Sequence, residues 1–144
     1  MSTLAYSHSV ARVGVQVAEA LAYSRQQGIL HCNLRPANLL LDTRGTVWVS
    51  DFGLIKEQGT EELTGQAEFV GTFRYMAPER FQGRSDPRSD VYGLGLTLYE
   101  MLALRPAFSA SDRARLVERA QHEEAPRPRK LEPHIPRDLE TVVL

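Results

Sequence analysis

The feature of this sequence that most constrains its fold is a series of three short motifs in a fixed order. The letters HCNLRPAN occupy residues 31–38, DFG occupies residues 51–53 and APE occupies residues 77–79. Each contains glycine, proline, asparagine or aspartate, which mark loops and turns. One such motif says little about a fold, whereas several in order select among few architectures. The segments around them are predicted from apolar periodicity.

The N-terminal part of the chain predicts one helix and several short strands. Apolar residues recur at helical spacing over residues 9–27, and Gly28 is expected to end this amphipathic helix as its C′ residue. Residues 29–30 predict a short strand that leads into the first motif. Residues 39–41 and 46–49 are two apolar runs separated by Asp-Thr-Arg-Gly, which predicts a hairpin.

The middle of the chain predicts a loop and then a buried helix. Residues 51–77 hold four glycines and few periodic apolar positions, which predicts a long, mobile loop of the kind that is usually functional. Residues 77–79 are expected to open a short helical turn. Ser89 is predicted to be the N-cap of a helix that runs to about Leu104 and is apolar on almost every side, so we expect it to be buried.

The C-terminal part predicts two further helices with an irregular segment between them. The first covers residues 111–121, and Pro136 starts the second, in which the sequence ends. Prolines punctuate residues 123–136, which are expected to be irregular and exposed. The basic run at 127–130 is interpreted as a solvated surface segment.

Composition and charge restrict the class of protein. With 144 residues, the chain suffices for one domain, and 17 basic against 18 acidic residues give no reason to expect a nucleic-acid or membrane-surface partner. The single cysteine, Cys32, excludes an internal disulfide and suits a reducing compartment. The N-terminus lacks the pattern of a secretory signal, and the apolar run 91–104 is too short to span a bilayer. We expect a cytoplasmic chain, and a membrane anchor in a longer parent chain stays open.

The three motifs, taken with their flanking residues, resemble a known family. Their order is similar to HRDLKPxN, DFG and APE in the C-terminal lobe of a protein kinase. GTFRYM at 71–76 resembles the substrate-side loop of that family, and DVYGLG at 90–95 resembles its central helix. The detailed sequence of these motifs is most similar to that of bacterial serine/threonine kinases of the eukaryotic type. The resemblance, which covers the chain from about Val10 to Leu144, implies an α+β, mainly helical fold with a small hairpin at its upper edge.

The resemblance also implies which residues would bind nucleotide and metal. Asp51 would bind magnesium through a carboxylate oxygen, and Asn38 would offer an amide oxygen to a second ion. Leu40 matches the position under the adenine ring, and Arg35 replaces a lysine near the transferred phosphoryl group. ATP and Mg²⁺ are therefore the implied cofactors. Outside the family, Asp51 would be a turn-forming residue and Asn38 a loop or cap residue.

Two substitutions depart from the family pattern in the catalytic loop. Asn33 stands where the family has the aspartate that accepts the substrate's proton, a function typically worth about 10²–10⁴-fold in rate. Cys32 replaces the arginine that pairs with a phosphorylated activation segment. That segment would hold Thr60, Thr64 and Thr72, and phosphorylation of Thr60 or Thr64 would lack its usual partner.

The remaining motif residues are expected to be structural. By resemblance, His31 packs near Phe52 in an internal spine, and Gly53 completes the DFG turn. Asp90 is expected to hydrogen-bond the loop around His31. Glu79 would pair in the family with an arginine beyond the last predicted helix, so we expect it to lack that partner here.

Three functions remain open from the sequence. The resemblance makes residues 1–144 a partial kinase domain, from the helix before the catalytic loop to the start of a late helix, and the chain looks cut at both ends. No Gly-rich phosphate loop or V-A-I-K lysine is present, so ATP binding by this chain should be weak or absent. The leading hypothesis is a catalytically degenerate, pseudokinase-like binding or regulatory module with an unidentified protein partner. The alternatives are part of an active serine/threonine kinase whose N-lobe lies outside this chain and which acts on a substrate protein, and a non-functional truncated product.

Overall fold

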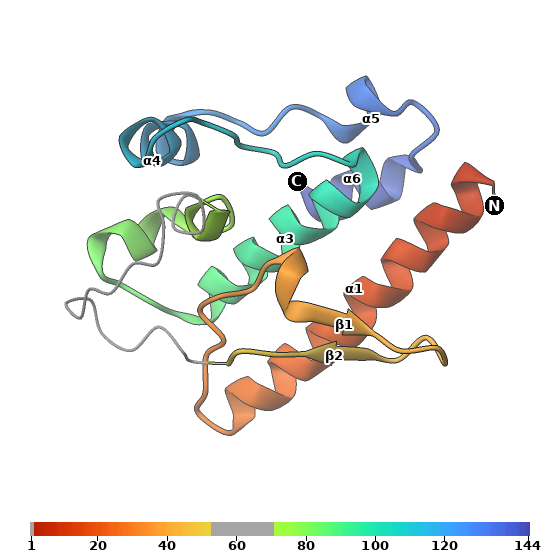
Figure 1. The fold of residues 1–144 in the computed structure, drawn as a ribbon, viewed down its shortest axis with the longest axis horizontal. Coiled ribbons are helices and arrows are strands. Elements are labelled where there is room, and N and C mark those ends of the chain that lie inside the picture. The colour runs from red at the N-terminus through yellow and green to blue at the C-terminus, as the bar shows by residue number, and fades with distance from the viewer. Residues whose placement is uncertain (1, 53–70) are drawn as a thin grey trace.

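A computed structural model describes residues 2–52 and 71–144, and it confirms a mainly helical α+β fold with a two-stranded antiparallel hairpin. Figure 1 shows helices α1 and α3 running side by side through the molecule, with the hairpin lying across α1. The elements are α1 (Thr3–Gln26), the 3₁₀ turn η1 (Pro36–Asn38), β1 (Leu39–Leu41), β2 (Val47–Val49), the 3₁₀ turn η2 (Pro78–Gln82), α3 (Pro87–Ala103), α4 (Arg113–His122), α5 (Pro128–Leu131) and α6 (Arg137–Val143).

Helix α1 begins earlier than its apolar periodicity predicts. Ser2 is its N-cap, and the Ser2 side chain accepts a hydrogen bond from the Ala5 N–H at 3.2 Å, so the helix starts at Thr3 rather than residue 9. The predicted end is confirmed, because Gly28 has φ +74° and donates its N–H to the Arg25 carbonyl at 2.9 Å.

Helix α3 is capped by a different residue from the one predicted. Asp86, not Ser89, is the N-cap: its carboxylate accepts from the Arg88 N–H at 2.6 Å, and the Ser89 hydroxyl accepts from the Asp86 N–H at 3.3 Å. Ser89 therefore completes a capping box from the third helical position. The predicted burial of the helix is confirmed by Leu96, Leu98, Tyr99 and Leu102.

Three apolar clusters form the described core, and α1 and α3 join them. The Tyr99 cluster lies between α3 and α4, the Leu98 cluster between α1, α3 and α6, and the Val17 cluster between α1 and the hairpin. Their buried members are Phe73, Leu96, Tyr99, Ala107, Phe108 and Leu116 in the first, Val10, Leu98, Leu102, Ile135 and Val143 in the second, and Val17, Leu21 and Leu34 in the third.

The predicted hairpin is confirmed to within one residue. Leu40 pairs with Trp48 at its centre, and both side chains face outward, 57% and 60% exposed. The opposite face of the hairpin packs on the Val17 cluster. Residues 29–30 are not a strand, because Ser24 satisfies both backbone groups of Ile29: the Ile29 N–H donates to the Ser24 carbonyl at 2.9 Å, and the Ser24 hydroxyl donates to the Ile29 carbonyl at 2.6 Å.

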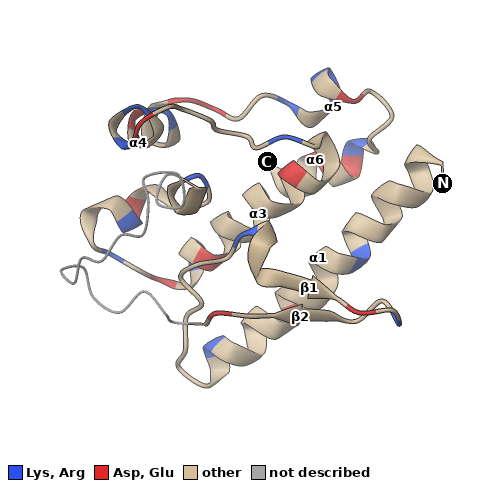
Figure 2. Cartoon of the chain, viewed as in Figure 1, with Lys and Arg blue, Asp and Glu red and all other residues tan. Residues whose placement is uncertain are grey.

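The C-terminal elements differ from their predictions in position and burial. Asp112 caps α4 and shifts it to residues 113–122. The segment 123–136 is neither wholly irregular nor wholly exposed, since it contains α5 and buries Pro128 and Ile135. Figure 2 shows acidic and basic residues interspersed on α4. Arg119 of this helix forms an ion pair at 2.8 Å with Glu123, its C-cap residue.

Of the loop predicted over residues 51–77, the structure describes residues 51–52 and 71–77. Residues 71–73 are helical rather than irregular, and residues 53–70 lie outside the described part. The predicted turn after residue 77 is confirmed by η2. Among residues 2–52 and 71–144, no helix is both long and apolar enough to cross a membrane.

Candidate active site

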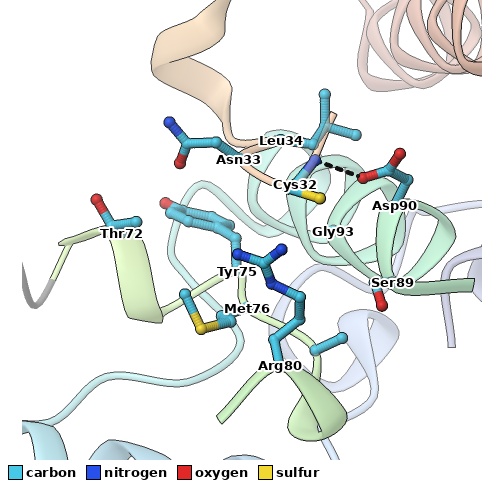
Figure 3. A pocket seen from close by; sticks show the side chains of 11 residues that line it. Cys32, Asn33, Leu34, Thr72, Tyr75, Met76, Arg80, Ser89, Asp90 and Gly93 are labelled. Atoms are coloured by element: carbon cyan, nitrogen blue, oxygen red, sulfur yellow. Dashed lines mark hydrogen bonds between the residues drawn. The ribbon is translucent and has the colours of Figure 1, made fainter. Parts of the chain in front are cut away.

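The loop at residues 31–38 is attached to the first turn of α3 by one buried carboxylate. Asp90 is 6% exposed, and its Oδ2 accepts the His31 N–H at 2.8 Å. Its Oδ1 accepts the Cys32 N–H at 2.8 Å, the bond drawn in Figure 3. The hydrogen bonds expected from the sequence for Asp90 are thus present. They hold Cys32 at φ +64°, in the left-handed region that a residue with a Cβ seldom adopts.

His31 connects this loop to the segment that leads to Asp51. Its Nδ1 accepts the Asn33 N–H at 3.1 Å, so Nε2 carries the proton and donates to the Ser50 carbonyl at 2.7 Å. The ring lies edge-on to Phe52 with centroids 4.4 Å apart, the packing expected from the sequence. Ser50 was not singled out by sequence reasoning, and its position directly before Asp51 was the available signal.

Ser50 also lies beside both candidate metal ligands. The Asn38 carbonyl accepts the Ser50 N–H at 2.9 Å, and the Ser50 hydroxyl lies 3.2 Å from Oδ2 of Asp51. The side-chain amide of Asn38 donates from Nδ2 to the Asn33 carbonyl at 2.7 Å, which leaves Oδ1 as an acceptor. Asp51 is exposed, with φ +61°.

These two side chains offer oxygen donors of the kind that magnesium prefers. The described residues contain no group of three or more His, Cys, Asp and Glu side chains that could hold a metal ion. An ion bound by Asn38 and Asp51 would therefore complete its shell with water and phosphate oxygens, which is the usual behaviour of Mg²⁺. The donor set fits Mg²⁺ better than it fits a metal that needs an all-protein cage.

Arg35 and Thr72, which come from distant parts of the sequence, meet at the loop. The Arg35 guanidinium donates to the Thr72 hydroxyl at 2.9 Å. Figure 3 shows the Asn33 amide and the Thr72 hydroxyl on the same side of a small pocket. The loop at residues 31–38 and the predicted substrate-side loop at residues 71–76 are therefore adjacent.

The small pocket lies between the loop at residues 31–38, residues 72–77 and the start of α3. The Arg80 side chain reaches into it beside Cys32 (Figure 3). The volume of the pocket is about 20 Å³, which is room for roughly one water molecule. Burial raises the pKa of the Cys32 thiol, and the nearby Arg80 guanidinium only partly opposes this. The pocket is too small for a nucleotide, and the thiol is not activated as a nucleophile.

The segment around Tyr75 and Glu79 is fixed to α3 by side chains. The Tyr75 hydroxyl donates to the Glu100 carboxylate, and burial followed by this hydrogen bond raises the pKa of Tyr75. Glu79 was expected to lack the arginine partner of the family, and in the structure its Oε1 accepts the Ser89 hydroxyl at 2.7 Å. Burial, with a smaller contribution from Glu79, raises the pKa of Tyr92 to about 12.

The remaining predicted residues lie apart from this centre or outside the described residues. Leu40 is on the outward face of the hairpin and presents its side chain to solvent. Gly53, Thr60 and Thr64 lie outside the described residues. The structure thus brings together the loop at residues 31–38, Ser50, Asp51 and Thr72.

Comparisons with known proteins show which family the chain is similar to. A family model described as the protein kinase domain matches residues 3–141. A probable serine/threonine-protein kinase of Streptomyces coelicolor is 35% identical over 133 residues, which cover 90% of this chain and 20% of that relative. PknB of Mycobacterium leprae is 36% identical over 128 residues, 88% of this chain and 21% of PknB. PrkC of Bacillus subtilis is 28% identical over 130 residues, 90% of this chain and 20% of PrkC. The chain spans about a fifth of the length of these curated relatives.

Proposed function

Because this chain belongs to the protein kinase family, we propose that it is a serine/threonine kinase-like module in which Asn33 has removed the catalytic base. Its role would then be binding or regulation, through a protein partner, rather than phosphoryl transfer. The observation that supports this is an ordered loop in which an amide, Asn33, stands at the position of the base. An amide carries no charge and does not take up a proton near neutral pH, so it can orient a hydroxyl but cannot act as its base.

The backbone around Asn33 is held on both sides. Its N–H donates to Nδ1 of His31 at 3.1 Å, and its carbonyl accepts from the Asn38 amide at 2.7 Å. The position of the side chain is therefore set by neighbours that do not depend on whether residue 33 is Asn or Asp. A substitution here changes the chemistry of the loop and leaves its shape in place.

Nucleotide would contact the other side of the same centre. Asn38 and Asp51 would hold Mg²⁺ through oxygen atoms, and Leu40 exposes an apolar surface that suits a purine ring. ATP–Mg²⁺, when bound, would supply the phosphoryl group. Only these contacts are proposed for the chain alone, so we expect calorimetry to find ATP–Mg²⁺ affinity weaker than low micromolar. A low-micromolar dissociation constant would show that further residues of the chain bind nucleotide.

The function of residue 33 is tested in a chimera with an established relative. The matching segment of Mycobacterium leprae PknB is exchanged for residues 3–141 of this chain, so that the rest of the kinase comes from PknB. We expect Asn33→Asp to raise turnover on the order of 10²–10⁴-fold, the usual effect of a positioned base. Nucleotide affinity should stay unchanged, because residue 33 would face the substrate hydroxyl.

The alternative is an active kinase in which the amide suffices. The contact between Arg35 and Thr72 favours it, since the charge near the substrate side is retained. In that case the Asn33 chimera and its Asn33→Asp variant would have equal turnover, and Asn33→Ala would be slower than both. A far slower Asn33 chimera, with Asn33→Ala no slower than it, supports the degenerate module.

A further inference from the structure

The edge of β2 that does not pair with β1 faces helix α1. On the inner side, the Ser50 N–H donates to the Asn38 carbonyl at 2.9 Å, and the Asp42 N–H donates to the Thr46 carbonyl at 3.0 Å. Inward and outward backbone groups alternate along an antiparallel strand. The carbonyl of Gly45 and the N–H of Val47 therefore point away from β1, where an edge strand leaves such groups without a ladder partner.

A single side chain from the middle of α1 satisfies both of these groups. The Nε2 of Gln16 donates to the Gly45 carbonyl at 3.0 Å, and its Oε1 accepts the Val47 N–H at 3.0 Å. The two partners fix the orientation of the amide, because a carbonyl needs the nitrogen and an N–H needs the oxygen. The Gln16 amide thus presents one donor and one acceptor to β2, as a neighbouring strand would.

We propose that Gln16 is a positioning residue that replaces a third strand and sets where the hairpin sits on α1. The strands have only three residues each, and a two-stranded hairpin of this kind is marginally stable in water. The apolar contacts under the hairpin attract it to α1 but have little directional preference. Hydrogen bonds depend strongly on geometry, so Gln16 selects one placement along the helix.

This placement reaches the candidate active site through β2. Val49 ends β2, Ser50 and Asp51 follow at once, and the Ser50 carbonyl accepts the Nε2 proton of His31 at 2.7 Å. A shift of β2 would therefore move Asp51 and weaken the contact between Ser50 and His31. The functional meaning of this positioning rests on the proposed nucleotide and metal side, but the contacts themselves can be tested without ligand.

The test compares Gln16→Met with Gln26→Met in the full chain. Methionine has a similar length and helix propensity but neither donor nor acceptor of comparable strength. Gln26 is the last residue of α1, and its side chain is exposed. The single tryptophan, Trp48, lies in β2, so its fluorescence reports the hairpin while circular dichroism reports the helices.

We expect amide exchange at Val47 to rise about tenfold in Gln16→Met, as for the loss of one hydrogen bond. The Trp48 fluorescence transition should fall to lower urea than the helical transition in this variant only. The proton on Nε2 of His31, observed by NMR, should exchange faster, which a role confined to the hairpin would not produce.

Two results would overturn the proposal. Coincident fluorescence and helical transitions, with Val47 exchange as in Gln26→Met, would show that Gln16 does not hold the hairpin. Faster Val47 exchange with an unchanged His31 proton would show that Gln16 stabilises β2 but does not position the active site. Neither result depends on nucleotide binding, so failure here is distinguishable from failure of the proposed function.

Discussion

Helices α1 and α3 bury apolar side chains between them and against α4 and α6, whereas the β1–β2 hairpin buries only one of its faces. On the helical side, Leu98 and Tyr99 are 6% and 1% exposed; on the hairpin, Leu40 and Trp48 are more than half exposed. The candidate active site draws on both regions. Asp90 attaches its loop to α3, and His31 attaches the same loop to the hairpin.

The candidate active site therefore has one rigid support, on α3, and one weak support, on the hairpin. The α3 side combines apolar burial with two hydrogen bonds from one buried carboxylate. The hairpin side depends on a small apolar face, one glutamine and a short turn. Local opening should therefore begin at the hairpin, because segments with few buried contacts open at lower free energy than the core.

The largest expected effect is the difference in unfolding free energy between two leucine-to-alanine substitutions, one in each region. Leu98→Ala removes a buried side chain and should lower the free energy of unfolding by about 3 kcal/mol, within the usual range for such cavities. Leu40→Ala should change it by less than about 0.5 kcal/mol, because the side chain is already exposed. Urea unfolding followed by circular dichroism measures both. Equal losses would remove the contrast between the regions.

Asp90→Asn should have the next largest effect. The amide can accept one of the two loop N–H groups and leaves the other, from His31 or Cys32, without an acceptor. We expect a loss of about 2 kcal/mol, the usual cost of a buried unsatisfied donor. The exposed Asp138, which lies on α6, gives a control whose substitution by Asn should be nearly neutral. A neutral Asp90→Asn would mean that the loop is held mainly from the hairpin.

A smaller, stabilising effect is expected where α3 ends. Leu104 caps the helix at φ +56° and is 79% exposed, so it occupies the left-handed region and buries little. Leu104→Gly should raise the free energy of unfolding by about 1 kcal/mol, because glycine adopts this conformation without the steric cost of a Cβ. Leu4→Gly, at an exposed position in the first turn of α1, should instead be slightly destabilising, since glycine is unfavourable in a helix. Thermal unfolding of both variants distinguishes the two positions.

The smallest effect concerns acid and the hairpin turn. Hydrogen bonds, first from the Thr46 backbone and then from the Trp48 indole, lower the pKa of Asp42 below its ordinary value of 3.8. A carboxyl with a lowered pKa in the folded state stabilises above its unfolded pKa, and that contribution is lost as pH falls through the folded value. The fluorescence of Trp48 should therefore change below about pH 4, before the helices respond.

The matched variant for this prediction is Asp42→Asn, which keeps an acceptor for the turn and removes the ionisation. Its Trp48 signal should be insensitive to pH in the range where the wild-type signal changes. If both proteins respond alike, another acidic group controls the hairpin.

Sequence reasoning succeeded where a local pattern was enough. Gly28 ends α1 because only its own conformation matters there, and the hairpin follows from two apolar runs and a turn. The contacts of Asp90 with His31 were expected from the resemblance, since spacing alone does not bring these two residues together.

It failed where a side chain satisfied backbone or polar groups in an unforeseen way. Ser24 used the hydrogen-bonding groups that a strand at Ile29 would need, and Asp86 competed successfully with Ser89 for the N-cap. The hydrogen bond from Ser89 to Glu79 depends on how η2 meets α3, and no periodicity contains that information. The role of Gln16 was missed for the same reason.

Asp90 holds the loop at residues 31–38 through two backbone N–H groups, and neither of these hydrogen bonds involves the side chain of Cys32. The backbone shape of the loop therefore does not depend on these bonds reaching any particular side chain. Substitutions at positions 32 and 33 are therefore expected to change the chemistry of the loop and to preserve its backbone shape. In such a protein the fold indicates the family, whereas the activity has to be tested at each residue of the site.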